Sequence, residues 1–267
     1  MSTTRLTTTN GVTFITKSND FYISKSLELY GEWSFGEIDL LAQILTESDI
    51  IVEAGAHIGA HTVFLAKDIV PDGKVFAFEP RRIIYQTLCG NLAVNGIENV
   101  HAFQCGLGEK AENQKEAKMD FSSNLNAGGY PLGAIPGNDE NIKIEKLDDV
   151  VNDAERIALI KADVEGYELK LLMGAANLIE RDRPFLYLEN DRVESSSELI
   201  SYLWGLKYDV WWHIVPLFNP SNRANTVQNI FSNIVSINIF CAPSEKGFDV
   251  KGSNKIEDAN FHPAKRS

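Results

Sequence analysis

Short apolar runs alternate with amphipathic segments along the middle of the chain. The runs 50–52 and 157–162 are apolar at nearly every position, which is typical of strands buried on both faces of a sheet. The segment 58–69 instead spaces its apolar residues as one stripe of a helix does. This alternation predicts a mostly parallel sheet covered by helices on both faces. The predicted strands are 50–52, 74–78, 100–104, 157–162 and 184–189, and the predicted helices are 36–47, 58–69, 82–94, 164–176 and 193–204.

The two ends of the chain lie outside this alternation. Short β-like runs at 13–15 and 21–23 flank polar turns, which predicts an irregular or β-hairpin segment at the N-terminus. The residues after the last apolar run are charged and predict a frayed tail. We therefore expect an N-terminal extension over 1–35, one α/β domain over 36–242 and a C-terminal tail over 243–267.

Two polar segments interrupt the predicted domain. Residues 108–140 are rich in glycine and proline and predict a long inserted loop, which an added edge strand over 142–147 follows. An Asn-rich loop at 218–233 separates the last two strands, 208–214 and 234–240, which predict a hairpin. The expected fold is a Rossmann-like α/β fold with a mostly parallel seven-stranded sheet and an antiparallel edge hairpin. Its ligand crevice lies at the carboxyl ends of the strands, where we expect both loops to close over an acceptor.

Composition narrows the class of partner. The formal net charge is −12 with no run of Lys or Arg, so the chain has no general attraction to nucleic acid or anionic lipid. Cys89, Cys105 and Cys241 are too sparse for a disulfide framework, which favours a reducing, cytoplasmic setting. No run approaches the ~20 apolar residues of a membrane helix. We expect a cytoplasmic protein that acts on a small molecule, without nucleic acid and without a transmembrane segment.

The turn after the first strand, Glu-Ala-Gly-Ala-His-Ile-Gly at 53–59, is the first candidate site. A dinucleotide site needs Gly-x-Gly-x-x-Gly, but His57 and Ala60 occupy its second and third glycine positions. Glu53 would also repel a phosphate at short range. S-adenosylmethionine carries no phosphate: its ammonium and sulfonium suit Glu53, and its carboxylate suits the N–H groups at the start of the helix. A plain strand–helix turn is the alternative interpretation.

Glu79 and Pro80 at the end of the second strand form the next candidate site. An acidic residue at this strand end accepts hydrogen bonds from ribose hydroxyls, and Pro80 stops the strand. Taken alone, Glu79 is more simply a surface residue. Together with Glu53 and Gly59, it predicts a pocket for a nucleoside.

Asp163 ends the central strand and begins a third acidic group, which includes Glu165 and Glu168. One interpretation is structural: Asp163 caps the following helix, and the two glutamates lie in its first turn. The other is functional: Asp163 faces the transferring methyl group, and Glu165 faces the acceptor. The sequence leaves both interpretations open for Asp163 and favours the structural one for the two glutamates.

Glu189 and Asn190 follow the next strand and add oxygen atoms beside Asp163. These three residues offer a Mg²⁺ pocket as one alternative. We prefer hydrogen bonding to acceptor hydroxyls and predict no metal ligand. Among the histidines, His213 near the end of a later strand is our candidate general base.

Four stretches of the chain resemble the FkbM-type methyltransferases. They are Val-Glu-Ala-Gly-Ala-His-Ile-Gly-Ala-His-Thr at 52–62, Phe-Glu-Pro at 78–80, Asn-Leu-Ala-Val-Asn-Gly at 91–96 and Ile-Lys-Ala-Asp-Val-Glu-Gly-Tyr-Glu at 160–168. The resemblance implies a Rossmann-like class I methyltransferase fold and S-adenosyl-L-methionine as the cofactor. It also implies O-methylation of a hydroxyl, often of a sugar in a glycan, a glycolipid or a natural product.

The resemblance further implies a role for each residue at a motif position. Glu53 and two glycines would hold the methionine part of the cofactor, Glu79 the ribose, and Asp163 the methyl side, with Asn91 close by. The stretch at 104–106 departs from the pattern, so backbone groups near Gly106 would have to contact the adenine. The predicted cofactor-binding residues are Glu53, Gly55, Ala56, His57, Gly59, Thr62, Glu79, Pro80, Asn91, Gly106 and Asp163.

The predicted chemistry is direct displacement, in which an acceptor hydroxyl attacks the sulfonium methyl in line. Alignment and desolvation are the main contributions of the protein, and Asp163, Glu165 or His213 takes the hydroxyl proton. Two other classes stay open. One is an NAD-linked oxidoreductase or epimerase, which Glu53 and the missing glycines disfavour; the other is a relative that binds the cofactor without turnover.

Overall fold

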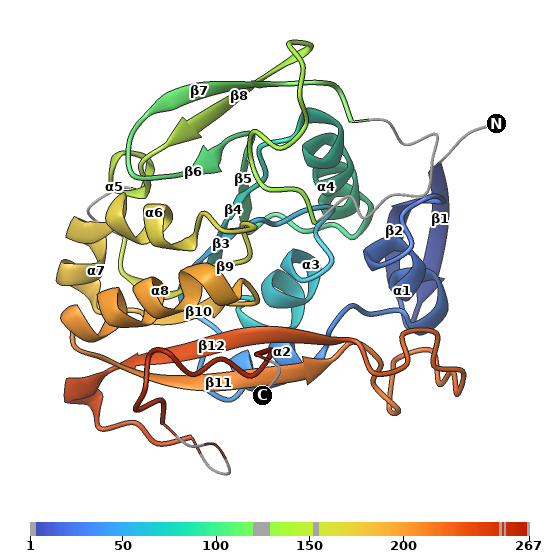
Figure 1. Cartoon of the computed structure of the whole chain (residues 1–267). Helices are drawn as coiled ribbons and strands as arrows, with labels where there is room; N and C mark the ends of the chain where they lie inside the picture. Colours follow the sequence, from blue (N-terminus) through green and yellow to red (C-terminus); the bar gives the residue numbers. More distant parts are fainter. Residues whose placement is uncertain (1–3, 120–128, 152–154, 251–252, 254, 266–267) are drawn as a thin grey trace.

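A seven-stranded sheet forms the centre of the computed structural model, which describes residues 4–119, 129–151, 155–250, 253 and 255–265 (Figure 1). The strand order is β11-β12-β10-β9-β3-β4-β5. The five strands from β10 to β5 are parallel, whereas β12 runs antiparallel to both β10 and β11. The predicted mostly parallel sheet with an antiparallel edge hairpin is therefore confirmed. The strands are β3 (Ile50–Ala54), β4 (Lys74–Phe78), β5 (Val100–Phe103), β9 (Ile157–Ala162), β10 (Phe185–Glu189), β11 (Tyr208–Pro216) and β12 (Val235–Pro243).

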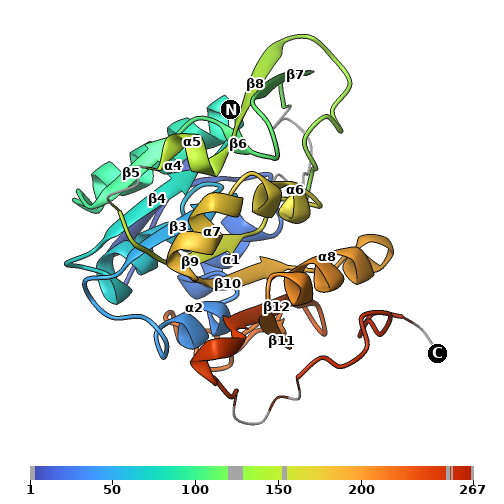
Figure 2. The same cartoon turned by 90° about the vertical axis from the view of Figure 1, so that its left-hand side faces the viewer.

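Helices cover both faces of this sheet because neighbouring residues along each strand point to opposite sides. Ile51 and Leu159 pack on one face, while Val52 and Ile160 pack on the other. Figure 2 views the molecule from the side on which α5 to α8 lie. None of the helices in the described ranges is long and apolar enough to cross a bilayer. The helices are α2 (Gly36–Leu41), α3 (Thr62–Phe64) and α4 (Arg82–Val94) on the first face, and α5 (Leu147–Val150), α6 (Glu168–Met173), α7 (Ala176–Asp182) and α8 (Val193–Gly205) on the second.

Two helices begin later than their apolar spacing predicts. The backbone at Gly55, His57 and Gly59 has positive φ, so the chain stays in turns before α3, and a π-helical turn, Leu65–Ile69, follows it. Glu165 and Gly166 also have positive φ, which keeps 163–167 out of the helix that was expected from 164. Asp163 therefore does not begin a helix as its cap. These turns place backbone and side chains at the carboxyl edge of the sheet.

The polar stretch 108–140 is not simply a long loop, and the strand after it does not join the main sheet. The stretch contains β7, and β8 pairs with β6 and β7 in a separate three-stranded sheet. The expectation of an added edge strand is wrong because β8 finds its partner in the preceding polar strand. The predicted loop also includes 120–128, which lie outside the described residues. The three strands are β6 (Gly106–Leu107), β7 (Glu112–Glu116) and β8 (Glu140–Glu145).

The N-terminal segment is a hairpin followed by a helix, packed beside the glycine turn. The run at 21–23 leads into this helix rather than forming a strand, because Asp20 accepts hydrogen bonds from the N–H groups of Tyr22 and Ser24. Asn91 of α4 holds the hairpin in place: its Oδ1 accepts the Ile15 N–H at 2.6 Å. The elements are β1 (Thr4–Thr9), β2 (Val12–Lys17) and α1 (Ile23–Tyr30).

The C-terminal tail is ordered where the chain returns to the sheet. Ile256 is buried and its N–H donates to the carbonyl of Val210. The His262 ring is also buried, with Nε2 at 2.8 Å from the carbonyl oxygen of Asn190. The prediction of a frayed tail is therefore wrong for 255–265, because two buried side chains in this segment pack against the domain.

Candidate active site

A cavity of about 450 Å³ lies at the carboxyl ends of β3, β4, β9 and β10. The chain order of the strands reverses beside β3, which is where open α/β sheets bind their ligands. Three kinds of group line it: the glycine turn after β3, a set of carboxylates with a few cations, and an apolar wall. The predicted residues that line the cavity are Glu53, Gly55, Ala56, His57, Glu79, Pro80, Gly106, Asp163 and Glu165.

The glycine turn is wedged between the ends of two neighbouring strands. The N–H groups of Gly55 and Ala56 both donate to the carbonyl of Phe78, each at 3.0 Å. Gly55 has φ +80°, and a Cβ atom on it would lie 1.8 Å from the carbonyl oxygen of Asp163. Only glycine fits there. The turn therefore brings the ends of β3, β4 and β9 into contact, and with them their acidic residues.

The Glu53 side chain is 1% exposed and lies where the ends of β3, β4 and β9 meet. Its Oε2 accepts a hydrogen bond from the Thr62 hydroxyl at 2.6 Å. Burial raises the pKa of Glu53 to about 7, although the positive charge of Lys161 opposes the shift. Thr62 does not itself line the cavity, so its observed role is to orient Glu53. Gly59 does not line the cavity either, and a Cβ atom on it would lie 2.8 Å from the Leu88 side chain.

Glu79 enters the same cavity from the end of β4. Its Oε1 accepts the N–H of Arg81 at 2.8 Å, and the side chain is 4% exposed. Burial raises its pKa to about 7, opposed by the hydrogen bond and the charge of Arg81. Glu53 and Glu79 therefore face one enclosed space, as a nucleoside pocket requires.

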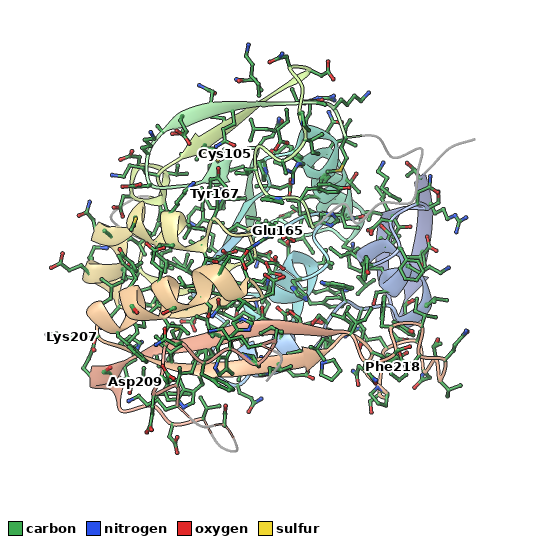
Figure 3. The ribbon with its side chains drawn as sticks, viewed as in Figure 1. Cys105, Glu165, Tyr167, Lys207, Asp209 and Phe218 are labelled. Atoms are coloured by element: carbon green, nitrogen blue, oxygen red, sulfur yellow. The ribbon has the colours of Figure 1, made fainter. Side chains whose placement is uncertain are left out.

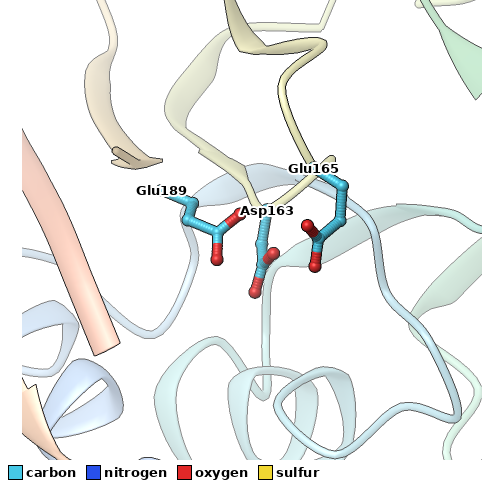
Figure 4. A group of neighbouring side chains, drawn as sticks. All are labelled: Asp163, Glu165 and Glu189. Carbon is cyan, nitrogen blue, oxygen red and sulfur yellow. The ribbon is translucent and has the colours of Figure 1, made fainter. Parts of the chain in front are cut away.

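Three further carboxylates converge at the ends of β9 and β10, as Figure 4 shows for Asp163, Glu165 and Glu189. One oxygen from each lies within 4.8 Å of the others. Burial and the charge of Asp163 raise the pKa of Glu165 to about 7 and that of Glu189 well above its usual range. Such a group can share a proton, and its oxygen atoms are also ligands that Mg²⁺ or Ca²⁺ accepts.

The predicted combination of Asp163, Glu189 and Asn190 does not form. The Asn190 carboxamide is buried and donates to the Ser196 hydroxyl at 2.9 Å. Glu165, and not Asn190, lies beside Asp163. The positive φ of Glu165 turns the Glu165 side chain back toward the cavity. Glu168 instead accepts the N–H groups of Val164 and Gly166, which is the structural role that we favoured for it.

Two cations lie among these acids, and neither was among the predicted site residues. Lys161 is 2% exposed, and its Nζ lies 3.9 Å from Glu37 Oε2. Arg192 forms an ion pair with Glu165. Lys161 was predictable in part, since residues two apart on a strand share a face and Asp163 marks that face as functional. Arg192 follows β10 by three residues, and nothing in the local pattern distinguishes it.

His213 and Asn91 differ from their expected places, whereas His57 does not. His213 does not line the cavity; its Nδ1 is hydrogen-bonded to the Tyr187 hydroxyl at 2.8 Å, so its expected role as base is not supported. Asn91 is fully buried behind the glycine turn, where its Nδ2 donates to the Ile58 carbonyl at 2.7 Å. His57 does line the cavity, and its ring nitrogens have no hydrogen-bond partner among the described residues. Burial lowers the pKa of His57.

An apolar wall, which no motif predicted, forms another part of the cavity lining. Its side chains come from the N-terminal segment, from the loop between β11 and β12 and from the start of β12. Figure 3 labels Glu165 near the middle of the molecule and Phe218 in this loop, where its ring contacts that of Tyr30 in α1. The N-terminal extension thus completes the cavity. The residues of the wall are Tyr22, Trp33, Leu217, Ile234 and Val235.

The fold is that of the Rossmann-like class I methyltransferases. The solved structure of the FkbM methyltransferase from Methylobacillus flagellatus KT matches it with a TM-score of 0.50 and 22% sequence identity, over 74% of this chain and 44% of that chain. The model of the methyltransferase FkbM domain matches residues 53–210, more than half of the chain. The chain belongs to the FkbM methyltransferase family.

Two curated relatives match about half of this chain. Methyltransferase sdnD of Sordaria araneosa is 29% identical over 163 residues, which cover 49% of this chain and 61% of the relative. Methyltransferase 1 of Beauveria bassiana (strain ARSEF 2860) is 26% identical over 152 residues, which cover 48% of this chain and 59% of the relative. The chain thus spans less than two thirds of the length of each.

The close contact at Gly55 predicts a severe loss of stability when a methyl group is added there. Gly55→Ala should cost about 1–2 kcal/mol from the positive φ and about 1–3 kcal/mol more from the contact with the Asp163 carbonyl. Gly96→Ala is the matched control, because Gly96 has φ +64° and no neighbour within 4 Å of its Cβ position. Urea unfolding measures both variants. Equal losses would show that the strand ends are not held by this contact.

Proposed function

We propose that the chain transfers a methyl group from S-adenosyl-L-methionine to a hydroxyl oxygen of a small-molecule or glycan acceptor. One observation carries the proposal: Glu53 and Glu79 line the same cavity as the glycine turn. Family membership supports methyl transfer, and the two curated relatives are named methyltransferases. The net charge of −12 disfavours a nucleic acid as the acceptor. All three cysteines are free thiols, which supports a cytoplasmic setting.

The carboxylates suit this cofactor better than they suit a dinucleotide. With the cofactor bound, Glu79 would accept hydrogen bonds from the ribose hydroxyls. Glu53 and Asp163 would face the ammonium and the sulfonium, whose positive charges favour ionised acids. The enclosed glutamates would repel a pyrophosphate, so an NAD-linked reaction is disfavoured. Cys105 and Gly106 also line the cavity, and their backbone groups would contact the adenine.

The reaction needs alignment and one proton acceptor. The acceptor oxygen forms its bond to the methyl carbon as the carbon–sulfur bond breaks, and S-adenosylhomocysteine leaves with the bonding electron pair. The hydroxyl proton passes to the carboxylate group of Asp163, Glu165 and Glu189, where Glu165 is the base. Its raised pKa keeps it a stronger base than an exposed glutamate, while it is still ionised in part at neutral pH. Arg192 orients it through their ion pair.

Replacing Glu79 tests the cofactor assignment. Glu79→Ala should weaken the binding of S-adenosylhomocysteine about 10- to 100-fold, because hydrogen bonds to a charged group contribute about 1.5–3 kcal/mol. Isothermal titration calorimetry measures this affinity, and NAD should give no binding heat. Glu180→Ala, on the exposed side of α7, is the control and should bind normally. Full affinity in Glu79→Ala would refute the ribose assignment, and tight binding of NAD would favour an oxidoreductase.

The pH dependence of turnover tests Glu165 as the base. With saturating cofactor, kcat should rise with pH and level off near or below pH 7, because the ionised form of Glu165 is the active one and a bound sulfonium lowers its pKa. Glu165→Gln should lower kcat about 100-fold or more and abolish this rise. The pH profile of each protein checks the prediction. An unchanged profile in Glu165→Gln would assign the proton to another group.

A further inference from the structure

The segment 129–133, which we call the strap, belongs to the polar insertion and forms part of the cavity lining. Tyr130 and Leu132 both line the cavity. A Cβ atom placed on Gly106 would lie 2.9 Å from Leu132 Cδ1 and 3.7 Å from Pro80 Cβ, so Leu132 packs directly against Gly106. We expected the insertion to close over the acceptor, but the strap lies beside the residue whose backbone we assign to the adenine.

A buried ion pair holds the strap on both sides of Leu132. Arg81 Nε and Nη2 donate to the two carboxylate oxygens of Glu116 at 3.2 and 3.3 Å. The side chain of Arg81 is 12% exposed and that of Glu116 is 2% exposed. Arg81 Nη2 also donates to the Pro131 carbonyl at 3.1 Å, and Glu116 Oε1 accepts the Gly133 N–H. Because a bidentate pair of this kind has a defined geometry, it fixes the backbone of the strap.

Arg81 connects the strap to the carboxylate that we assign to the ribose. Its N–H donates to Glu79 Oε1 at 2.8 Å, while its guanidinium holds the strap. One residue therefore sets the positions of Glu79 and Leu132 relative to each other. A nucleoside needs both kinds of group, since its ribose hydroxyls donate hydrogen bonds and the faces of its base are apolar.

Leu132 is only partly buried by the protein itself, although it lines the cavity. Part of its apolar surface is therefore left for a ligand to cover, which favours binding by the hydrophobic effect. The methionine part of the cofactor is assigned to Glu53 and the glycine turn. The two ends of the cofactor thus depend on different residues.

We propose that Leu132 covers the adenine of the bound cofactor, and that the Arg81–Glu116 ion pair is the positioning element that holds Leu132 there. This inference rests on the proposed function and adds a determinant of nucleoside binding that no motif predicted. It also assigns the strap to the cofactor rather than to the acceptor.

The affinities of the full chain for two ligands test the role of Leu132. 5′-Methylthioadenosine contains the nucleoside of the cofactor without its amino-acid part, whereas S-adenosylhomocysteine contains both. Leu132→Ala should weaken the binding of both ligands by the same factor, about 5-fold or more, because the lost apolar contact belongs to the nucleoside. Isothermal titration calorimetry measures both affinities. Leu6→Ala is the matched control and should bind normally, because Leu6 is 71% exposed and does not line the cavity.

A change at the other end of the cofactor should give a different pattern. Glu53→Gln should weaken the binding of S-adenosylhomocysteine and leave that of 5′-methylthioadenosine unchanged, because only the former carries an ammonium group. The same calorimetric titrations measure this difference. Equal weakening of both ligands in Glu53→Gln would show that the two ends of the cofactor cannot be separated in this way, which overturns the assignment of Leu132 to the nucleoside alone.

A double-mutant cycle tests the ion pair as a positioning element. Glu116→Gln removes the charge but keeps an oxygen that can accept the Gly133 N–H. It should weaken the binding of 5′-methylthioadenosine about 3-fold in the unaltered protein and have little further effect in Leu132→Ala, because the pair acts through Leu132. Urea unfolding checks that each variant is folded. An equal effect of Glu116→Gln in both proteins would overturn the positioning role.

The outcomes separate this inference from the proposed function. If both ligands bind the unaltered protein and Leu132→Ala binds them normally or more tightly, the inference is overturned and the proposed function stands. If Leu132→Ala weakens S-adenosylhomocysteine but not 5′-methylthioadenosine, the inference is also overturned, because Leu132 then contacts the amino-acid part. If S-adenosylhomocysteine does not bind the unaltered protein, the proposed function itself fails.

Discussion

The contact between Gly55 and the carbonyl of Asp163 is the constraint on which the rest of the site depends. It leaves no room for a side chain, and the hydrogen bonds to Phe78 hold the same turn from the other side. Three strand ends are therefore drawn together, and an acidic residue lies next to the last residue of each strand. The crowding of Glu53, Glu79 and Asp163 follows from this packing, since parallel strands that end at one edge present their next residues to one space.

Burying several carboxylates close together lowers the stability of the folded protein unless a cation or a proton accompanies them. The site meets this cost in two ways. Lys161 and Arg192 supply permanent positive charge, while Glu53, Glu79 and Glu165 have raised pKa values near 7 and so retain protons in part. A cationic cofactor would replace those protons. The arrangement that is unfavourable for the carboxylates alone thus favours the cationic ligand that we propose.

The sequence predicted the parts of the molecule that have a strong local signal. Apolar runs such as 157–162 revealed the strands, and the glycines after β3 revealed the turn. The polar strand β7 gave no such signal, because its stability comes from pairing with β8 rather than from burial on two faces. Helix starts were misplaced where Glu165 and His57 adopt positive φ, a conformation that their residue types do not indicate.

The site was predictable where residues follow strands, and not where it depends on distant packing. Glu53, Glu79 and Asp163 are at strand ends, so topology alone brings them together. Tyr22 and Ile234 come from segments more than 200 residues apart, which the aromatic contacts around Phe231 join. The apolar wall could only be found in three dimensions.

Proton release on cofactor binding tests the central claim most directly. Titration of S-adenosyl-L-methionine near pH 7, in two buffers with different ionisation enthalpies, measures how many protons leave the protein. Our account predicts net release, because the cation favours the ionised forms of Glu53 and Glu79, and the release should fall toward zero well above pH 8. Binding with no release at pH 7, or with proton uptake, would contradict the account.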